Sequence, residues 1–179
     1  MPELDLFPVK NRTTSILIQV QPEEALEAQL VLTKNLIARG FNVIILSGGR
    51  PCRDLISTYE AKKIDLTKIH VLDMVCRSQR IDTKDSEIVT HMENIQSLTK
   101  ISVYLNKMDI SNKTVLFIDS LTSMLIYSDE EIFSRFISDI VQKMKVREVH
   151  LVLLIVKTKN YDNLRSELKY LCNQEASFK

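Results

Sequence analysis

Four runs of aliphatic residues constrain the fold of this 179-residue chain more than any other feature. They read SILIQV, FNVIILS, TVLFIDS and EVHLVLLIV, at 15–20, 41–47, 114–120 and 148–156, and a weaker run, KIHVLDMV, covers 68–75. The apolar residues in these runs are continuous and do not alternate with polar ones. Strands that are buried on both faces have this pattern, which is typical of a parallel sheet covered by helices.

Amphipathic segments lie between the aliphatic runs. Segment 22–40 opens with Pro22 and two glutamates and closes with Arg39 and Gly40, an order that matches the helix dipole and the preferred positions of proline and glycine. Further helices are predicted from Pro51 onward and over 91–108, 129–145 and 161–173. This alternation predicts an α/β fold, a doubly wound and mostly parallel sheet of five or six strands flanked by helices.

The length suits one domain, which we expect over 15–173, with an N-terminal arm at 1–14 and a C-terminal tail at 174–179. The N-terminus lacks the apolar core of a signal peptide, and the longest apolar run, about seven residues, is too short to span a membrane. The three cysteines, Cys52, Cys76 and Cys172, are odd in number and widely spaced, which fits a reducing compartment. We therefore expect a cytoplasmic protein without a membrane segment.

Charge and residue spacing argue against several kinds of site. The net charge is +1, and the basic stretch KMKVRE at 143–148 has no interleaved aromatic residues, so nucleic-acid binding is not expected. The histidines at positions 70, 91 and 150 do not cluster with one another or with the cysteines, so the sequence predicts no metal site. No base can be assigned to any cysteine thiol, and no cofactor motif is present.

The stretch SGGRP at 47–51 contains two of the three glycines in the chain. One interpretation is a strand-to-helix turn, with the glycines at positive φ and Pro51 at the first helical position. The other is an anion site, in which Gly48 and Gly49 form a backbone nest beside a helix N-terminus and Arg50 supplies a bidentate fork. Both alternatives remain open from the residues alone.

Segment 114–145, TVLFIDSLTSMLIYSDEEIFSRFISDIVQKMK, resembles the Walker B region of RecA-like ATPases, specifically of the KaiC-like branch. The four apolar residues at 115–118 precede Asp119 and Ser120, and a short apolar helix and a longer amphipathic helix follow. ENIQSLTKISVYLNKM and HLVLLIVKT are similar to the family's preceding helix and following strand. The resemblance spans residues 15 to 172 and implies a RecA-like, three-layer P-loop NTPase fold.

The resemblance also shows which catalytic parts are missing. Active members carry a glycine-rich phosphate loop with Lys and Ser or Thr after the first strand. The stretch QVQPEEALEAQLV at this place has none of these residues and puts Glu23, Glu24 and Glu27 where a triphosphate would lie. SGGRP occupies the place of the family's catalytic glutamate pair. The resemblance therefore implies a degenerate member, a pseudo-ATPase.

Two functions follow as expectations. The first is a non-catalytic regulatory or scaffold module that acts through protein contacts, with self-association or pairing with an active KaiC-like ATPase implied by the resemblance. The alternative is a small-ligand, nucleotide or anion sensor at the carboxyl edge of the sheet. Asp119 is expected there either as a ligand contact or as the cap of the short helix after it. The candidate binding residues are Ser47, Gly48, Gly49, Arg50, Asp73, Asp119 and Ser120.

Overall fold

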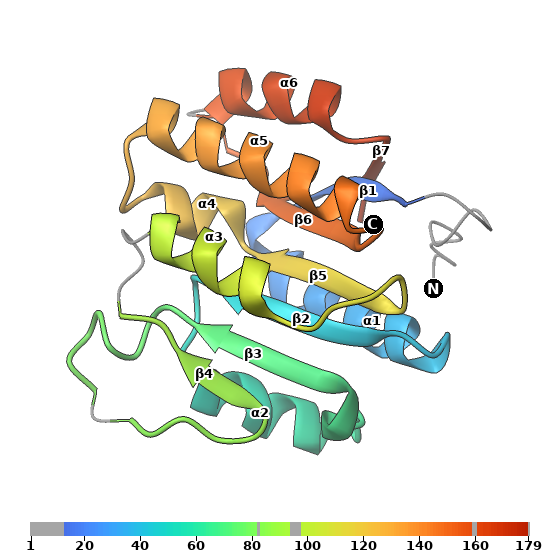
Figure 1. The fold of residues 1–179 in the computed structure, drawn as a ribbon, viewed down its shortest axis with the longest axis vertical. Helices are drawn as coiled ribbons and strands as arrows, with labels where there is room; N and C mark the ends of the chain where they lie inside the picture. The colour runs from blue at the N-terminus through green and yellow to red at the C-terminus, as the bar shows by residue number, and fades with distance from the viewer. Residues whose placement is uncertain (1–12, 82, 94–97, 159–160, 179) are drawn as a thin grey trace.

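The computed structural model describes residues 13–81, 83–93, 98–158 and 161–178, and it shows an α/β domain built on one sheet (Figure 1). The sheet has seven strands in the order β4-β3-β2-β5-β6-β1-β7. Every neighbouring pair is parallel. The strands are β1 (Ser15–Val20), β2 (Asn42–Ser47), β3 (Ile69–Asp73), β4 (Val89–His91), β5 (Thr114–Asp119), β6 (His150–Val156) and β7 (Gln174–Ser177). The predicted fold class is confirmed.

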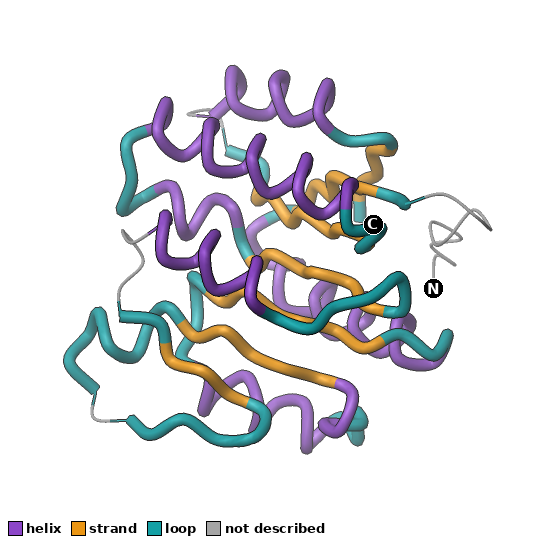
Figure 2. The backbone as a smooth tube through the Cα atoms, viewed as in Figure 1, coloured by secondary structure: helices purple, strands orange, loops and turns teal. Residues whose placement is uncertain are grey.

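Helices cover both faces of the sheet, which gives three layers (Figure 2). On one face lie η1 (Pro22–Glu24), α1 (Ala25–Ala38) and α2 (Cys52–Ala61). On the other face lie α3 (Leu98–Lys107), α4 (Leu121–Leu125), α5 (Glu130–Val146) and α6 (Asp162–Leu171), and the short helix η2 (Leu66–Lys68) leads into β3. Within the described ranges, no helix is long and apolar enough to cross a membrane.

The five inner strands β1, β2, β3, β5 and β6 each contribute to two hydrophobic cores, one on either side of the sheet. Along β1, Ile16 and Ile18 pack with the core under α1 and α2, whereas Leu17 packs with the core under α3 to α6. Successive side chains of a strand point to opposite faces, so a sheet that is covered on both sides needs an apolar residue at every position. This requirement accounts for the continuous aliphatic runs.

Two short edge strands account for the higher strand count. β4 and β7 read VTH and QEAS, so no aliphatic run marks them. The helix predicted over 91–108 begins later than expected, because His91 ends β4 and α3 starts at Leu98. The segment expected as a tail also contributes to the domain, since β7 pairs with β1 and Phe178 is buried. Most of the expected N-terminal arm, residues 1–12, lies outside the described residues.

The predicted glycine end of the first long helix is confirmed. Gly40 has a φ of 88°, and its N–H donates to the carbonyl of Ile37 at 2.9 Å. The N–H of Phe41 donates to the carbonyl of Leu36 at 3.1 Å, which completes a Schellman motif. Gly48 and Gly49 do not have positive φ, so they do not form the left-handed turn considered from the sequence. They do not form the backbone nest either, because a nest pairs a right-handed with a left-handed residue.

Candidate functional site

The carboxyl ends of β2 and β5 lie next to each other at the centre of the sheet. The chain leaves β2 for α2 on one face and leaves β5 for α4 on the other face (Figure 1). Such a topological switch point is where α/β sheets usually bind ligands. The strand register aligns Ser47 with both Asp73 and Asp119, so the structure brings the predicted site residues to one edge.

Residues 47–50 form a compact turn that is held by the ends of neighbouring elements. The Ser47 hydroxyl donates to the carbonyl of Arg50 at 2.9 Å, and the N–H of Gly48 donates to the carbonyl of Asp119 at 2.9 Å. A Cβ on Gly49 would lie 2.8 Å from the Ser123 hydroxyl oxygen. Gly49 has no left-handed φ, so its backbone conformation does not call for glycine. A larger residue there would instead force the Ser123 side chain to move.

Asp119 and Arg50 are the charged side chains of this switch point. Asp119 is 6% exposed, and burial raises the pKa of its carboxyl to about 6, although the positive charge of Arg50 acts in the opposite direction. Ser120, and not Asp119, caps the short helix: the Ser120 hydroxyl accepts the N–H of Ser123 at 3.3 Å. The capping role considered for Asp119 is thus wrong. The structure leaves Asp119 as a buried acid beside a half-buried arginine.

The connection after β1 is short and acidic. β1 ends at Val20 and η1 begins at Pro22, so Gln21 alone joins the two elements. The Gln21 N–H donates to the Glu24 carboxylate at 3.2 Å. Glu23 and Glu24 lie in η1, and Glu27 lies in the first turn of α1.

Asp73 is fully buried, and its carboxylate is engaged by backbone groups. One oxygen accepts the N–H of Cys52 at 2.7 Å, and the other accepts the N–H groups of Val75 at 2.6 Å and Cys76 at 3.0 Å. Burial alone would raise the pKa of Asp73, but the hydrogen bonds from Cys76 and Cys52 outweigh it and lower the pKa. Asp73 therefore holds the start of α2 and the turn after β3 in place.

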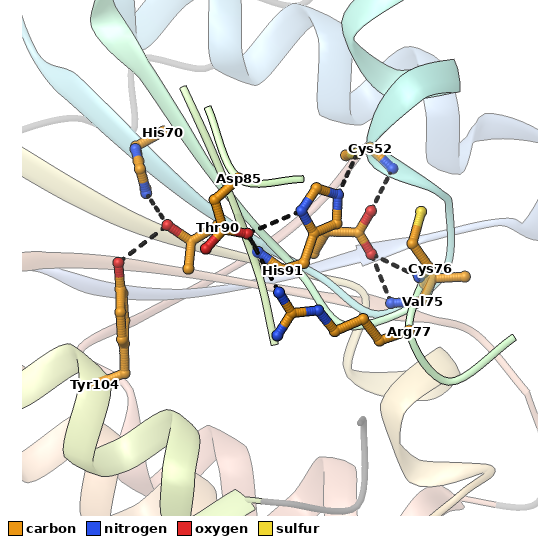
Figure 3. Close-up of polar contacts among 10 residues, drawn as sticks. Cys52, His70, Val75, Cys76, Arg77, Asp85, Thr90, His91 and Tyr104 are labelled. Carbon is orange, nitrogen blue, oxygen red and sulfur yellow. Dashed lines mark hydrogen bonds and ion pairs between the residues drawn. The ribbon is translucent and has the colours of Figure 1, made fainter. Parts of the chain in front are cut away.

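A second group of side chains surrounds Asp73. One ligand-type atom from each of Cys52, Asp73, Cys76 and His91 lies within 4.8 Å of the others, and all four residues are buried. The Cys52 sulfur is 3.4 Å from His91 Nε2, and His91 Nδ1 is 3.0 Å from the Asp85 carboxylate, as Figure 3 shows. We call these four residues the Cys₂–His–Asp cluster.

Two chemistries are open to such a cluster, metal binding and thiol reactivity. Burial raises the pKa of the Cys52 thiol and raises that of Cys76 to about 11, with Asp73 adding to both. The thiolate is both the nucleophile and the metal ligand, so the raised pKa values do not distinguish the two chemistries. A nucleophile must also be open to its substrate, and both thiols are buried. The arrangement is therefore better suited to binding a metal than to nucleophilic catalysis.

The sequence does not reveal this cluster, because its members come from three different strand ends. Cys52 follows β2, Asp73 ends β3 and His91 ends β4, and the β3–β4 register aligns Asp73 with His91. Neighbouring parallel strands end at the same edge, so residues far apart in the chain meet there. The available signal was Asp73 followed three residues later by Cys76, which is too weak to indicate a site alone.

No known protein-family profile and no curated protein matches this chain. Solved structures do resemble it. A KaiC-like protein of the hyperthermophilic archaeon Pyrococcus horikoshii has a TM-score of 0.63 at 11% identity, over 93% of this chain and 72% of that one. An uncharacterized protein of the same archaeon, solved in complex with an unknown peptide, has a TM-score of 0.67 at 12% identity. The match covers 99% of this chain and 82% of that one.

The ATPase domain of G40P is also similar, with a TM-score of 0.55 at 15% identity, over 94% of this chain and 70% of that one. At these identities the comparisons concern the arrangement of strands and helices. They agree with the three-layer sheet described above and confirm the resemblance seen in the sequence. The chain has a RecA-like arrangement of strands and helices, which it shares with the KaiC-like protein and with the ATPase domain of G40P.

Proposed function

We propose that the chain is a non-catalytic RecA-like module that acts through protein–protein contacts and does not hydrolyse ATP. The observation that carries this proposal is the connection from β1 to η1, which consists of Gln21 alone. In the ATPases that the sequence resembles, this is the place of the phosphate-binding loop.

A phosphate loop works by pointing several backbone N–H groups at the phosphates, with glycines that permit the close approach. The single connecting residue here uses its N–H to bind Glu24. Glu23, Glu24 and Glu27 follow in η1 and in the first turn of α1, and each carboxylate would repel a nearby phosphate by roughly 1 kcal/mol in a well-solvated setting. Both the geometry and the charge of this connection support the loss of phosphoryl transfer.

Apolar side chains at the carboxyl edge support a role in protein contacts. Ile126, Tyr127 and Ile132 are 67%, 52% and 60% exposed, and all three lie at or near the connection between α4 and α5. Large exposed apolar side chains that lie close together are typical of interaction surfaces. One structural neighbour was solved in complex with an unknown peptide, which is in keeping with this role.

The half-buried Arg50 at the switch point favours a second candidate function, an anion sensor without hydrolysis. Arg50 lies immediately before Pro51 and the start of α2, so its guanidinium fork lies beside the positive end of the helix dipole. The first N–H of α2, that of Cys52, is taken by Asp73, so Arg50 itself would provide the main contact to an anion.

One experiment separates these functions. Purified protein is incubated with Mg²⁺ and ATP, and thermal shifts are recorded with ATP, ADP and sulfate. We expect no phosphate release above background and no rise in melting temperature, because the connection after β1 provides no cradle. Phosphate release that Asp119→Asn abolishes would contradict the proposal.

The thermal shifts also test the anion sensor. A saturating ligand raises the melting temperature by mass action. A rise that Arg50→Ala removes, and that the matched variant Arg53→Ala on the exposed side of α2 retains, would support the sensor instead.

A further inference from the structure

We propose that Cys52, Asp73, Cys76 and His91 form a structural zinc site. The site joins the start of α2, the end of β3 and the end of β4, and thereby closes the loop that leads from Cys76 to β4 (Figure 3). This inference stands on the geometry of the Cys₂–His–Asp cluster and does not depend on the proposed function.

The distances in the cluster match a tetrahedral zinc ion. Zinc binds thiolate sulfur at about 2.3 Å and imidazole nitrogen at about 2.0–2.1 Å, so sulfur and nitrogen ligands lie about 3.5 Å apart and two sulfurs about 3.8 Å apart. The Cys52 sulfur and His91 Nε2 are 3.4 Å apart, and all four ligand atoms lie within 4.8 Å of one another. Small rotations of these side chains are enough to place the four atoms around one ion.

His91 is oriented as a metal ligand. A carboxylate can only accept hydrogen bonds, so the Nδ1 of His91 donates its proton to Asp85 at 3.0 Å. The other ring nitrogen, Nε2, then carries a free lone pair and faces the Cys52 sulfur. Metal-binding histidines usually have such a carboxylate partner, which fixes the tautomer and the ring. Asp85 is itself positioned by the backbone N–H of His91 at 2.8 Å and by Arg77 at 3.7 Å.

Asp73 completes the set. Its carboxylate accepts three backbone N–H groups and is therefore fixed in place. A carboxylate offers about four lone-pair positions, so one remains for a metal. Two thiolates and an imidazole select zinc over magnesium or calcium, and four protein ligands without an open position are typical of structural sites.

A catalytic thiol explains the same residues less well. Cys52, His91 and Asp85 do follow the order of a thiol, a base and an orienting acid. However, Cys52 is 7% exposed and His91 is 5% exposed, so little of either side chain is open to a substrate. A closed metal site requires this burial, whereas a nucleophile would be disabled by it.

The first test measures metal in the full chain, purified under reducing conditions without chelator. Elemental analysis should find about one zinc ion per chain. Replacement of zinc by Co²⁺ should produce thiolate-to-cobalt charge-transfer bands and the intense visible bands of tetrahedral cobalt. A strong chelator should lower the melting temperature by about 5–10 °C, and added zinc should restore it.

Variants show which residues bind the metal. Cys52→Ser and Cys76→Ser should lose the zinc, while Cys172→Ser, a matched change beyond the end of α6, should retain it. Asp85→Asn leaves every ligand in place and should weaken zinc affinity about 10- to 100-fold in competition with a chromogenic chelator. This variant keeps the test decisive even if the cysteine variants do not fold.

Three results would overturn the proposal. The first is folded, reduced protein that contains no zinc and shows no thiolate bands with Co²⁺. The second is an unchanged zinc content and affinity in Cys52→Ser, Cys76→Ser and Asp85→Asn. The third is a thiol count that shows a Cys52–Cys76 disulfide in the protein as purified.

Discussion

At the scale of single residues, the ionisation of Asp119 is coupled to folding. Burial raises the pKa of this carboxyl from 3.8 to about 6, and Arg50 offsets part of the effect. The folded state therefore holds the proton more tightly than the unfolded state. Between these two pKa values the contribution of Asp119 to stability therefore falls as pH rises. Above the folded pKa, the folded state bears the full free-energy cost of a buried charged carboxylate.

We expect Asp119→Asn to raise the free energy of unfolding by about 1–3 kcal/mol at pH 8, because the amide carries no charge to desolvate. The gain should shrink as pH falls through the folded pKa of about 6, and it should vanish below the usual carboxyl pKa of 3.8. Urea denaturation of both proteins across this range measures the difference. Asp54→Asn, which changes an exposed acid in α2, is the matched control. A gain from Asp119→Asn that stays constant down to pH 4 would refute the coupling.

At the scale of elements, α5 shows how end signals and an apolar face combine. The Asp129 carboxylate accepts the N–H groups of Glu131 at 3.0 Å and Ile132 at 3.2 Å, which satisfies two donors that the helix leaves open. Lys143 and Lys145 lie in the last turn, where positive charge complements the helix dipole. The inner face buries Phe133, Phe136, Ile137, Ile140, Val141 and Met144.

We expect Asp129→Ala to lower the free energy of unfolding by about 1 kcal/mol, because the cap is lost while the buried face is unchanged. Asp129→Asn keeps an acceptor oxygen, so its free energy of unfolding should fall clearly less. Urea denaturation of the three proteins measures both changes. Equal losses in the two variants would show that charge, and not the capping hydrogen bonds, stabilises this helix end.

At the scale of the whole molecule, exposed apolar residues are found at both edges of the sheet. Ile126 and Tyr127 lie at the carboxyl edge after α4, whereas Val146 ends α5 at the opposite edge. A stable dimer buries at least about 1,000 Å² in total, so it needs more than scattered side chains. The grouping of Ile126, Tyr127 and Ile132 makes the carboxyl edge the expected contact surface.

We expect light scattering to show self-association of the wild type that increases with concentration. The double variant Ile126→Ser/Tyr127→Ser should shift the protein toward the monomer, because it removes apolar contact area. The control pair Val146→Ser/Tyr170→Ser changes residues that are even more exposed, 84% and 93%, but lie away from this edge, and it should leave self-association unchanged. A wild type that stays monomeric at high concentration and recovers no partner in pull-downs would contradict a role in protein contacts.

Local patterns accounted for most of the layered architecture. Both faces of the central strands are buried, so their sequences are continuously apolar, and Gly40 ends α1 through a backbone conformation that favours glycine. The edge strands β4 and β7 were missed, because an edge strand can be short and polar. The role of Gly49 was also missed: its lack of a side chain makes room for Ser123, which lies far along the chain.

By itself, the sequence determined the fold class and the order in which strands and helices follow one another along the chain. It also determined the acidic stretch without glycine after the first strand. These features depend on residues that are neighbours in the chain, through strand and helix periodicity and backbone freedom. Only the tertiary structure decided that Cys52, Asp73, Cys76 and His91 meet, and that Asp119 is buried beside Arg50. Such contacts depend on which strands are neighbours and in which register, and long-range packing selects both.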